Sequence, residues 1–227
     1  MNRPRRHIVR PALFAALLVL AGLSLLSACG GSPPVYVQQY LLAYAPPAPA
    51  GVKVLPAAIK VERFGALPQF TTQRMLYLPD SYQVGYYANH RWQGYPSDMV
   101  AGLLARDLAD SGRFSAVFGP ASPQMPRFVV EGGLVKFWED DRAGGPAAQL
   151  EVVITLLDIQ QGETVKRVMF QNKYQATRDM AAKKAQNLAQ SLSQAMAQIS
   201  PRVAKDVYQA VAQRLTKGEP PLEKPTP

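Results

Sequence analysis

The sequence has 227 residues, of which 48% are hydrophobic and 18% are charged, so it is long enough for one domain with a hydrophobic core. Its 25 basic residues outnumber the 16 acidic ones but are scattered along the chain, which argues against a nucleic-acid-binding protein. Cys29 is the only cysteine, so no internal disulfide can form and the fold must depend on its core.

The first 28 residues have the three parts of a secretory signal peptide. Four arginines form a basic head, residues 11–26 are an apolar run too short for a comfortable transmembrane helix, and small residues lead to Cys29. A plain secretory signal would need no cysteine at this point. The stretch Leu26-Ser27-Ala28-Cys29 resembles the lipobox of bacterial lipoproteins.

The lipobox resemblance implies cleavage between Ala28 and Cys29, diacylglycerol on the Cys29 sulfur, and a further acyl chain, such as palmitate, on the freed amine. A thiolate is nucleophilic enough to accept the lipid, and two or more acyl chains give stable membrane attachment. Two glycines and no aspartate follow Cys29, which by the same resemblance points to the outer membrane, facing the periplasm. The mature chain would have 199 residues and, with 21 basic against 16 acidic residues, a net charge of +5.

Residues 29–34 are expected to form a lipidated tether, and residues 35–215 a single domain. The first part of this domain is rich in β-branched and aromatic residues between turn-forming residues, which predicts short strands. The expected strands are 35–44, 52–62, 75–78 and 83–88, and Pro79-Asp80-Ser81 is a plausible turn between the last two. Residues 89–96 are expected to be irregular.

Residues 97–111 carry the clearest short helix pattern. Ser97 can cap the start of this helix, and Gly112 stands where a left-handed C-terminal cap is expected. Apolar residues recur at helical spacing and form one stripe. The stripe consists of Val100, Leu103, Leu104 and Leu108. A short strand over residues 114–118 should follow.

Three adjacent segments joined by short loops predict an antiparallel meander over residues 127–138, 150–157 and 165–175. The first segment contains Gly132-Gly133, which indicates a bulge or a close approach of another group. The second alternates apolar residues on one face. The third is expected to place Val168, Phe170 and Tyr174 on one face.

The longest helix is expected over residues 180–199, where apolar residues repeat every three or four positions. Pro201 allows two interpretations: Ser200 caps a second helix that runs to about residue 215, or one kinked helix continues through the proline. The proline-rich residues 216–227 should be a disordered tail. The elements together predict an α+β fold, in which a mixed or antiparallel sheet is backed by an amphipathic helix and a long C-terminal helix.

The sequence offers no support for catalysis or for a metal site. His90 is the sole histidine after cleavage, without a cluster of further ligands, and is expected to be a surface or loop residue. Glu139-Asp140-Asp141 lacks the spacing of a calcium loop and is expected to be a solvated turn. No serine has a credible histidine base beside it. We therefore expect a non-enzymatic protein with no cofactor other than the acyl lipids on Cys29.

Five aromatic residues gather within fourteen positions, and Tyr and Trp are enriched at protein interfaces. The group consists of Tyr82, Tyr86, Tyr87, Trp92 and Tyr95. Tyr86, Tyr87 and Trp92 are the candidate partner surface. The alternative is that they close the sheet edge over the following helix, and for Trp92 this alternative is favoured.

Four stretches carry a resemblance to a known family: IKVERFGALP at residues 59–68, YANHRW at 87–92, LLARDLADSGRFSAVF at 103–118, and the segment 129–141. In this order they resemble the ABC-type transport auxiliary lipoproteins, which include paraquat-inducible protein C. The likeness covers roughly residues 36–213. The loop 93–96 departs from it, because it is longer before its proline than the family pattern.

This resemblance implies a periplasm-facing lipoprotein that works beside an MCE-domain protein and an ABC transporter, moving phospholipid or another hydrophobic substrate between membranes. It also implies a mixed sheet backed by helices. A second interpretation is an assembly or pilot lipoprotein that stabilises an outer-membrane β-barrel or a secretin. The sequence leaves open whether the protein forms a homo-oligomer and whether the domain itself holds a lipid.

Overall fold

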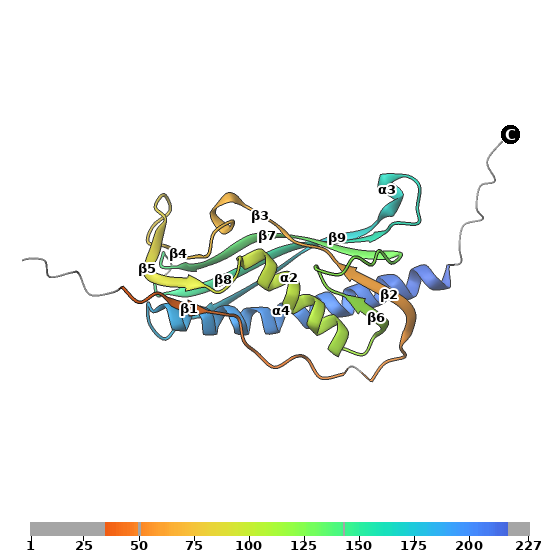
Figure 1. Ribbon diagram of the computed structural model, residues 1–227, viewed down its shortest axis with the longest axis horizontal. Helices are drawn as coiled ribbons and strands as arrows, with labels where there is room; N and C mark the ends of the chain where they lie inside the picture. Colours follow the sequence, from red (N-terminus) through yellow and green to blue (C-terminus); the bar gives the residue numbers. More distant parts are fainter. Residues whose placement is uncertain (1–34, 50, 143, 218–227) are drawn as a thin grey trace, which may run out of the picture. The chain divides into compact units, whose positions relative to one another are not determined.

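The computed structural model describes residues 35–49, 51–142 and 144–217. Its sheet is built on β7 (Phe128–Asp140), a strand of 13 residues. Along its whole length one edge of β7 pairs with the antiparallel β8 (Ala147–Asp158), which pairs in turn with β9 (Val168–Asp179) (Figure 1). This arrangement confirms the predicted meander.

Three strands share the other edge of β7, and all three run parallel to it. β2 (Leu55–Val61) pairs near the start of β7, β3 (Gly65–Ala66) pairs with its middle, and β4 (Arg74–Leu78) pairs with its end. β2 and β4 each pair with a further strand on their other side.

Two short wings continue the sheet beyond these strands. Next to β4 lie the antiparallel β5 (Gly85–Trp92) and then β1 (Gln38–Tyr40), which is parallel to β5. Next to β2 lies the parallel β6 (Phe114–Phe118). The described sheet has nine strands and contains both parallel and antiparallel pairs.

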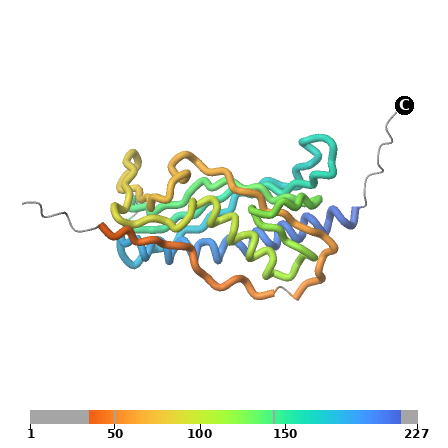
Figure 2. The backbone as a smooth tube through the Cα atoms, in the orientation of Figure 1, coloured from red at the N-terminus to blue at the C-terminus, as the bar shows by residue number. Residues whose placement is uncertain are grey.

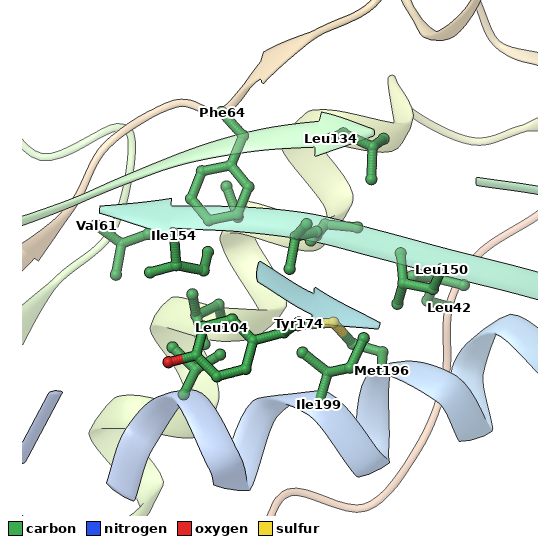
Figure 3. Close-up of a cluster of buried hydrophobic side chains, with 14 of the residues drawn as sticks. Leu42, Val61, Phe64, Leu104, Leu134, Leu150, Ile154, Tyr174, Met196 and Ile199 are labelled. Atoms are coloured by element: carbon green, nitrogen blue, oxygen red, sulfur yellow. The ribbon is translucent and has the colours of Figure 1, made fainter. Parts of the chain in front are cut away.

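Two helices cover one face of the sheet and form the core with it: α2 (Pro96–Asp110) and α4 (Ala185–Thr216). Alternate side chains of β8, such as Leu150 and Ile154, are buried toward α4, where they meet Met196 and Ile199 (Figure 3). The short helices η1 (Pro68–Phe70) and α3 (Thr164–Arg167) lie in loops. The predicted fold class is confirmed.

The chain between β1 and β2 runs beside the two long helices without regular structure (Figure 2). It is fixed there by polar contacts to both of them. The Tyr44 hydroxyl donates to the buried Asp107 carboxylate of α2 at 2.6 Å, and the Ala43 amide donates to Ser193 Oγ of α4 at 3.0 Å. Leu42, directly before these two residues, is buried in the core.

Several predicted boundaries were wrong, each for a local reason. Residues 89–92 are the second half of β5 rather than an irregular segment. Ser97 is buried and does not cap α2, which begins at Pro96, a residue suited to the first turn because it lacks an amide hydrogen. Gly112 does adopt the expected positive φ, of 62°.

The C-terminal part is one helix, not two, and Pro201 lies inside it. The helix also begins five residues later than predicted, because the amide of Met180 still donates to Pro146 O at 2.9 Å and so continues the pairing of β9 with β8. β9 begins at Val168, since residues 164–167 form α3. A register shift beside Leu157 disrupts the predicted alternation, leaving Val168 exposed and Tyr174 buried.

From Val37 to residue 217 the described residues form one compact unit. The predicted signal peptide, Cys29 and the tether lie outside the described residues, as does the tail from residue 218 onward. Within the described ranges, no helix has the length and apolar character needed to cross a membrane.

Candidate functional site

A pocket of about 490 Å³ lies at the end of β7, between β4, β5 and the turn before α4. Aromatic side chains form its walls and ionisable side chains form its base. The residues that define it are Tyr77, Tyr86, Tyr87, Glu139, Asp141 and Lys183, and we call it the carboxyl pocket.

Glu139 lies at the end of β7 and is only 1% exposed. β4 pairs with β7 at this position, with Tyr77 opposite Glu139. The Tyr87 hydroxyl donates a hydrogen bond to Glu139 Oε2. Burial raises the pKa of Glu139 from its ordinary 4.5 to about 7, and the nearby Asp141 adds to this, although the Tyr87 hydrogen bond and Lys183 oppose it.

Asp141 is the second carboxyl group of the pocket. Its side chain is 6% exposed and forms an ion pair of 2.9 Å with Lys183, whose own side chain is 60% exposed. Its amide donates to Leu78 O at 3.1 Å, which fixes the chain as it leaves β7. The other carboxylate oxygen, Oδ1, is buried and has no hydrogen-bond partner among the described residues. The pocket therefore holds two neighbouring carboxyl groups beside a lysine.

The aromatic walls are held by contacts of their own. Tyr77 and Tyr87 meet edge to face with 5.5 Å between ring centroids. The Arg74 guanidinium lies 3.6 Å from the ring centroid of Tyr86. Burial, and then the hydrogen bond to Glu139, raises the pKa of Tyr87 above its ordinary value, so this phenol stays protonated and remains a donor.

A second pocket of about 340 Å³ adjoins the first and shares Tyr87 and Lys183 with it. It is lined by Tyr40 of β1 and His90 of β5, whose hydroxyl and Nδ1 atoms are 3.0 Å apart. Both pockets lie where the β1–β5–β4 wing meets the turn before α4. They form a polar, aromatic depression in which carboxyl groups and lysines lie together, an arrangement that can bind a small polar group.

The structure separates the three residues of the candidate partner surface. Tyr86 and Tyr87 are half-buried in the walls of the carboxyl pocket. Trp92 is 1% exposed and packs on Phe137 with 5.0 Å between ring centroids. Trp92 is thus a core residue, as favoured above, and cannot be part of a surface.

The expectation for residues 139–141 was wrong, because they are not a solvated turn. Glu139 and Asp140 are strand residues, 1% and 5% exposed, and Asp140 binds Arg142 through two hydrogen bonds of 2.7 and 2.6 Å. His90 is a strand residue as well, and it is partly buried. No group of three or more metal-ligating side chains occurs in the described part of the chain.

No local pattern assigns Tyr77 or Lys183 to a site. Tyr77 reaches the pocket through the pairing of β4 with β7, and Lys183 reaches it from the turn before α4 through its ion pair with Asp141. The run of three acidic residues directly after apolar strand residues was the one local signal. Acidic residues that directly continue an apolar strand can belong to that strand, as Glu139 and Asp140 do, rather than to a solvated turn.

Comparisons with known proteins agree with this fold. No curated protein matches the chain. Protein XCC0632 from Xanthomonas campestris, of family DUF330, is similar in structure, with a TM-score of 0.71 and 18% identity over 79% of this chain and 99% of that one. A second solved structure, an uncharacterized protein, has a TM-score of 0.58 and 12% identity over 76% and 99% of the two chains. At these identities the likeness is one of fold.

The sequence profile of one family, described as the ABC-type transport auxiliary lipoprotein component, matches residues 40–204. The match spans most of the chain, and it extends from β1 to the middle of α4. It includes both wings of the sheet, the meander and the carboxyl pocket. The chain therefore belongs to the family of ABC-type transport auxiliary lipoprotein components.

Proposed function

We propose that this protein is a non-enzymatic auxiliary lipoprotein of an MCE-type intermembrane lipid transport system. In this proposal, the acyl chains on Cys29 hold the protein in the outer membrane, and its domain engages an MCE-domain protein and its ABC transporter from the periplasmic side. The family membership over residues 40–204 carries the proposal. The lipobox that ends at Cys29 supports it.

The half-buried tyrosines of the carboxyl pocket are the surface we assign to the partner. Tyr86 and Tyr87 present aromatic area beside buried acceptors, and anchor residues at interfaces combine these properties. Lys183 at the same pocket adds an exposed positive charge that can select an acidic partner group. This role involves no covalent chemistry.

The test is affinity purification of the lipidated protein from crosslinked, detergent-solubilised envelopes, followed by mass spectrometry. Recovery of an MCE-domain protein is expected, together with an at least tenfold lower recovery for the Tyr86→Ala variant. Val165→Ser is the matched control, because Val165 is 85% exposed on α3 and far along the sheet from the pocket. Recovery of a β-barrel or secretin subunit without an MCE-domain protein would favour the assembly role instead.

A further inference from the structure

We infer that the tip of the β4–β5 hairpin, residues 79–84, contacts the membrane surface and places Tyr82 among the lipid headgroups. The inference rests on the lipid anchor of the proposed function and adds an orientation to it. Three observations support it: the length of the tether, the direction of β1, and the side chains at the hairpin tip.

The tether is short. Val37, the first residue of the compact unit, lies eight positions after Cys29. A fully extended chain of this length spans at most roughly 29 Å. An acylated Cys29 therefore keeps the start of β1 within that distance of the bilayer surface.

The hairpin tip lies at the same end of the sheet as the start of β1 (Figure 1). β1 runs parallel to β5, with Gln38 opposite His90. Gly85, the first residue of β5, precedes His90 by five positions, or about 17 Å of strand. Because the two strands run in the same direction, the chain enters β1 from the side on which the hairpin tip lies.

The tip exposes one side chain almost completely and a second one by about half. Tyr82 is 99% exposed and Val84 is 51% exposed. Asp80 Oδ1 accepts hydrogen bonds from the amides of Tyr82 and Gln83 at 2.7 and 2.9 Å, which fixes the turn that presents the tyrosine. A tyrosine favours the membrane interface, where its ring meets acyl chains and its hydroxyl meets water.

The opposite end of the meander supplies a matched control. α3 joins β8 to β9 there and carries Val165, which is 85% exposed. The 12 residues of β8 separate this end from the pocket end by about 40 Å. A membrane that touches the hairpin tip end-on does not reach Val165.

The experiment uses the mature lipidated protein in vesicles of phosphatidylethanolamine and phosphatidylglycerol. Cys29 is the only cysteine, so when its sulfur carries the lipid, an introduced cysteine is the only free thiol. Gln83→Cys and Val165→Cys are each labelled with the environment-sensitive dye NBD. Headgroup-level nitroxide lipids are expected to quench the label at 83 at least threefold more than the label at 165.

Adding Tyr82→Ser to Gln83→Cys is expected to lower the quenching to that seen at residue 165, and it leaves the fold intact because Tyr82 contacts almost nothing. Equal quenching at both ends, or quenching at 83 that Tyr82→Ser leaves unchanged, would overturn the inference. The mass of the N-terminal peptide separates two failures. An unmodified Cys29 defeats the anchor itself, whereas a lipidated Cys29 with an unquenched label at 83 defeats only the orientation.

Discussion

The ring of Phe64 occupies the space beside Gly132 in which a side chain at that position would have to lie. Gly132 is in the middle of β7 opposite Ile154, and the Phe64 ring, seen in the core in Figure 3, fills the gap that the glycine leaves. The neighbouring Gly133 has open space where its side chain would be. Packing therefore requires glycine at position 132 but leaves room for a side chain at position 133.

Gly132→Ala is expected to destabilise the protein by about 2 kcal/mol, because the Phe64 ring must leave its place in a packed core. Gly133→Ala is the control and should change the free energy of unfolding by less than about 0.5 kcal/mol. Urea denaturation of both variants measures the difference. Equal stabilities would contradict the packing described for Phe64.

Asp158→Asn is expected to destabilise the fold by about 3 kcal/mol, since it removes the charge that pairs with two arginines at the end of β8. Arg127 binds Asp158 through two hydrogen bonds of 2.9 Å, and Arg214 of α4 lies 3.2 Å away. Burial by itself would raise the pKa of Asp158, but these partners hold it below its ordinary value.

The matched control for Asp158 is Glu163→Gln, which breaks the ion pair with Lys166. Both of these side chains are largely exposed, so the change should cost less than about 0.5 kcal/mol. Thermal and urea unfolding at neutral pH compare the two variants. Similar losses of stability in Asp158→Asn and Glu163→Gln would mean that burial does not make the Asp158 ion pairs stronger than the exposed Glu163–Lys166 pair.

Glu139 is expected to make the protein less stable as the pH rises from 4.5 to 7. Its pKa is raised to about 7 in the folded protein, so the folded state binds the proton more tightly than the unfolded state does, and that advantage is complete below pH 4.5. Ionisation across this interval costs up to about 3 kcal/mol. Glu139→Gln should flatten the pH dependence, measured by urea unfolding at several pH values.

The exposed Glu131→Gln variant serves as the control for Glu139→Gln, because it changes the same charge on the same strand at a solvated position. Its unfolding should keep the pH dependence of the unaltered protein. A protein whose stability rises between pH 4.5 and 7, with the slope unchanged in Glu139→Gln, would refute the assignment.

Tyr87→Phe is expected to raise the pKa of Glu139 above 7. The Tyr87 hydroxyl donates to the carboxylate and favours its charged form, and phenylalanine leaves the carboxylate buried without this donor. NMR titration of the 13C-labelled Glu139 carboxyl group measures the change. Tyr86→Phe is the control, because it keeps the ring that packs under Arg74 and leaves the Tyr87 hydrogen bond in place.

Local patterns predicted most of the elements of this fold but little of their pairing. The meander and α2 follow from alternation and helical spacing, which depend on neighbours in sequence. The parallel pairing of β2, β3 and β4 with β7 depends on contacts across as many as about 70 residues, and no local pattern encodes it. The Gly132-Gly133 pair indicated a close approach, but not that Phe64 makes it.

Dependence on long-range contacts also explains why only part of the carboxyl pocket could be predicted from the sequence. Tyr86 and Tyr87 were identified from their aromatic grouping, whereas Glu139 was assigned to a solvated turn because its acidic neighbours have the composition of one. Only the pairing of Tyr77 with Glu139 shows that this residue belongs to a strand inside the sheet, with β4 beside it. Lys183 joins the pocket because α4 begins later than its periodicity suggests, which leaves residues 181–184 free to form the turn.

Three strands that precede β7 in the sequence share one of its edges, so they cannot pair there until β7 has been made. During synthesis or vectorial passage across a membrane, β2, β3 and β4 emerge before the strand that joins them. Their unpaired edges and the apolar face of α2 remain uncovered until about residue 140 has appeared, and β8 and α4 complete the core only later. A long interval with exposed strand edges favours aggregation, so the chain is most prone to aggregate before its last helix is available.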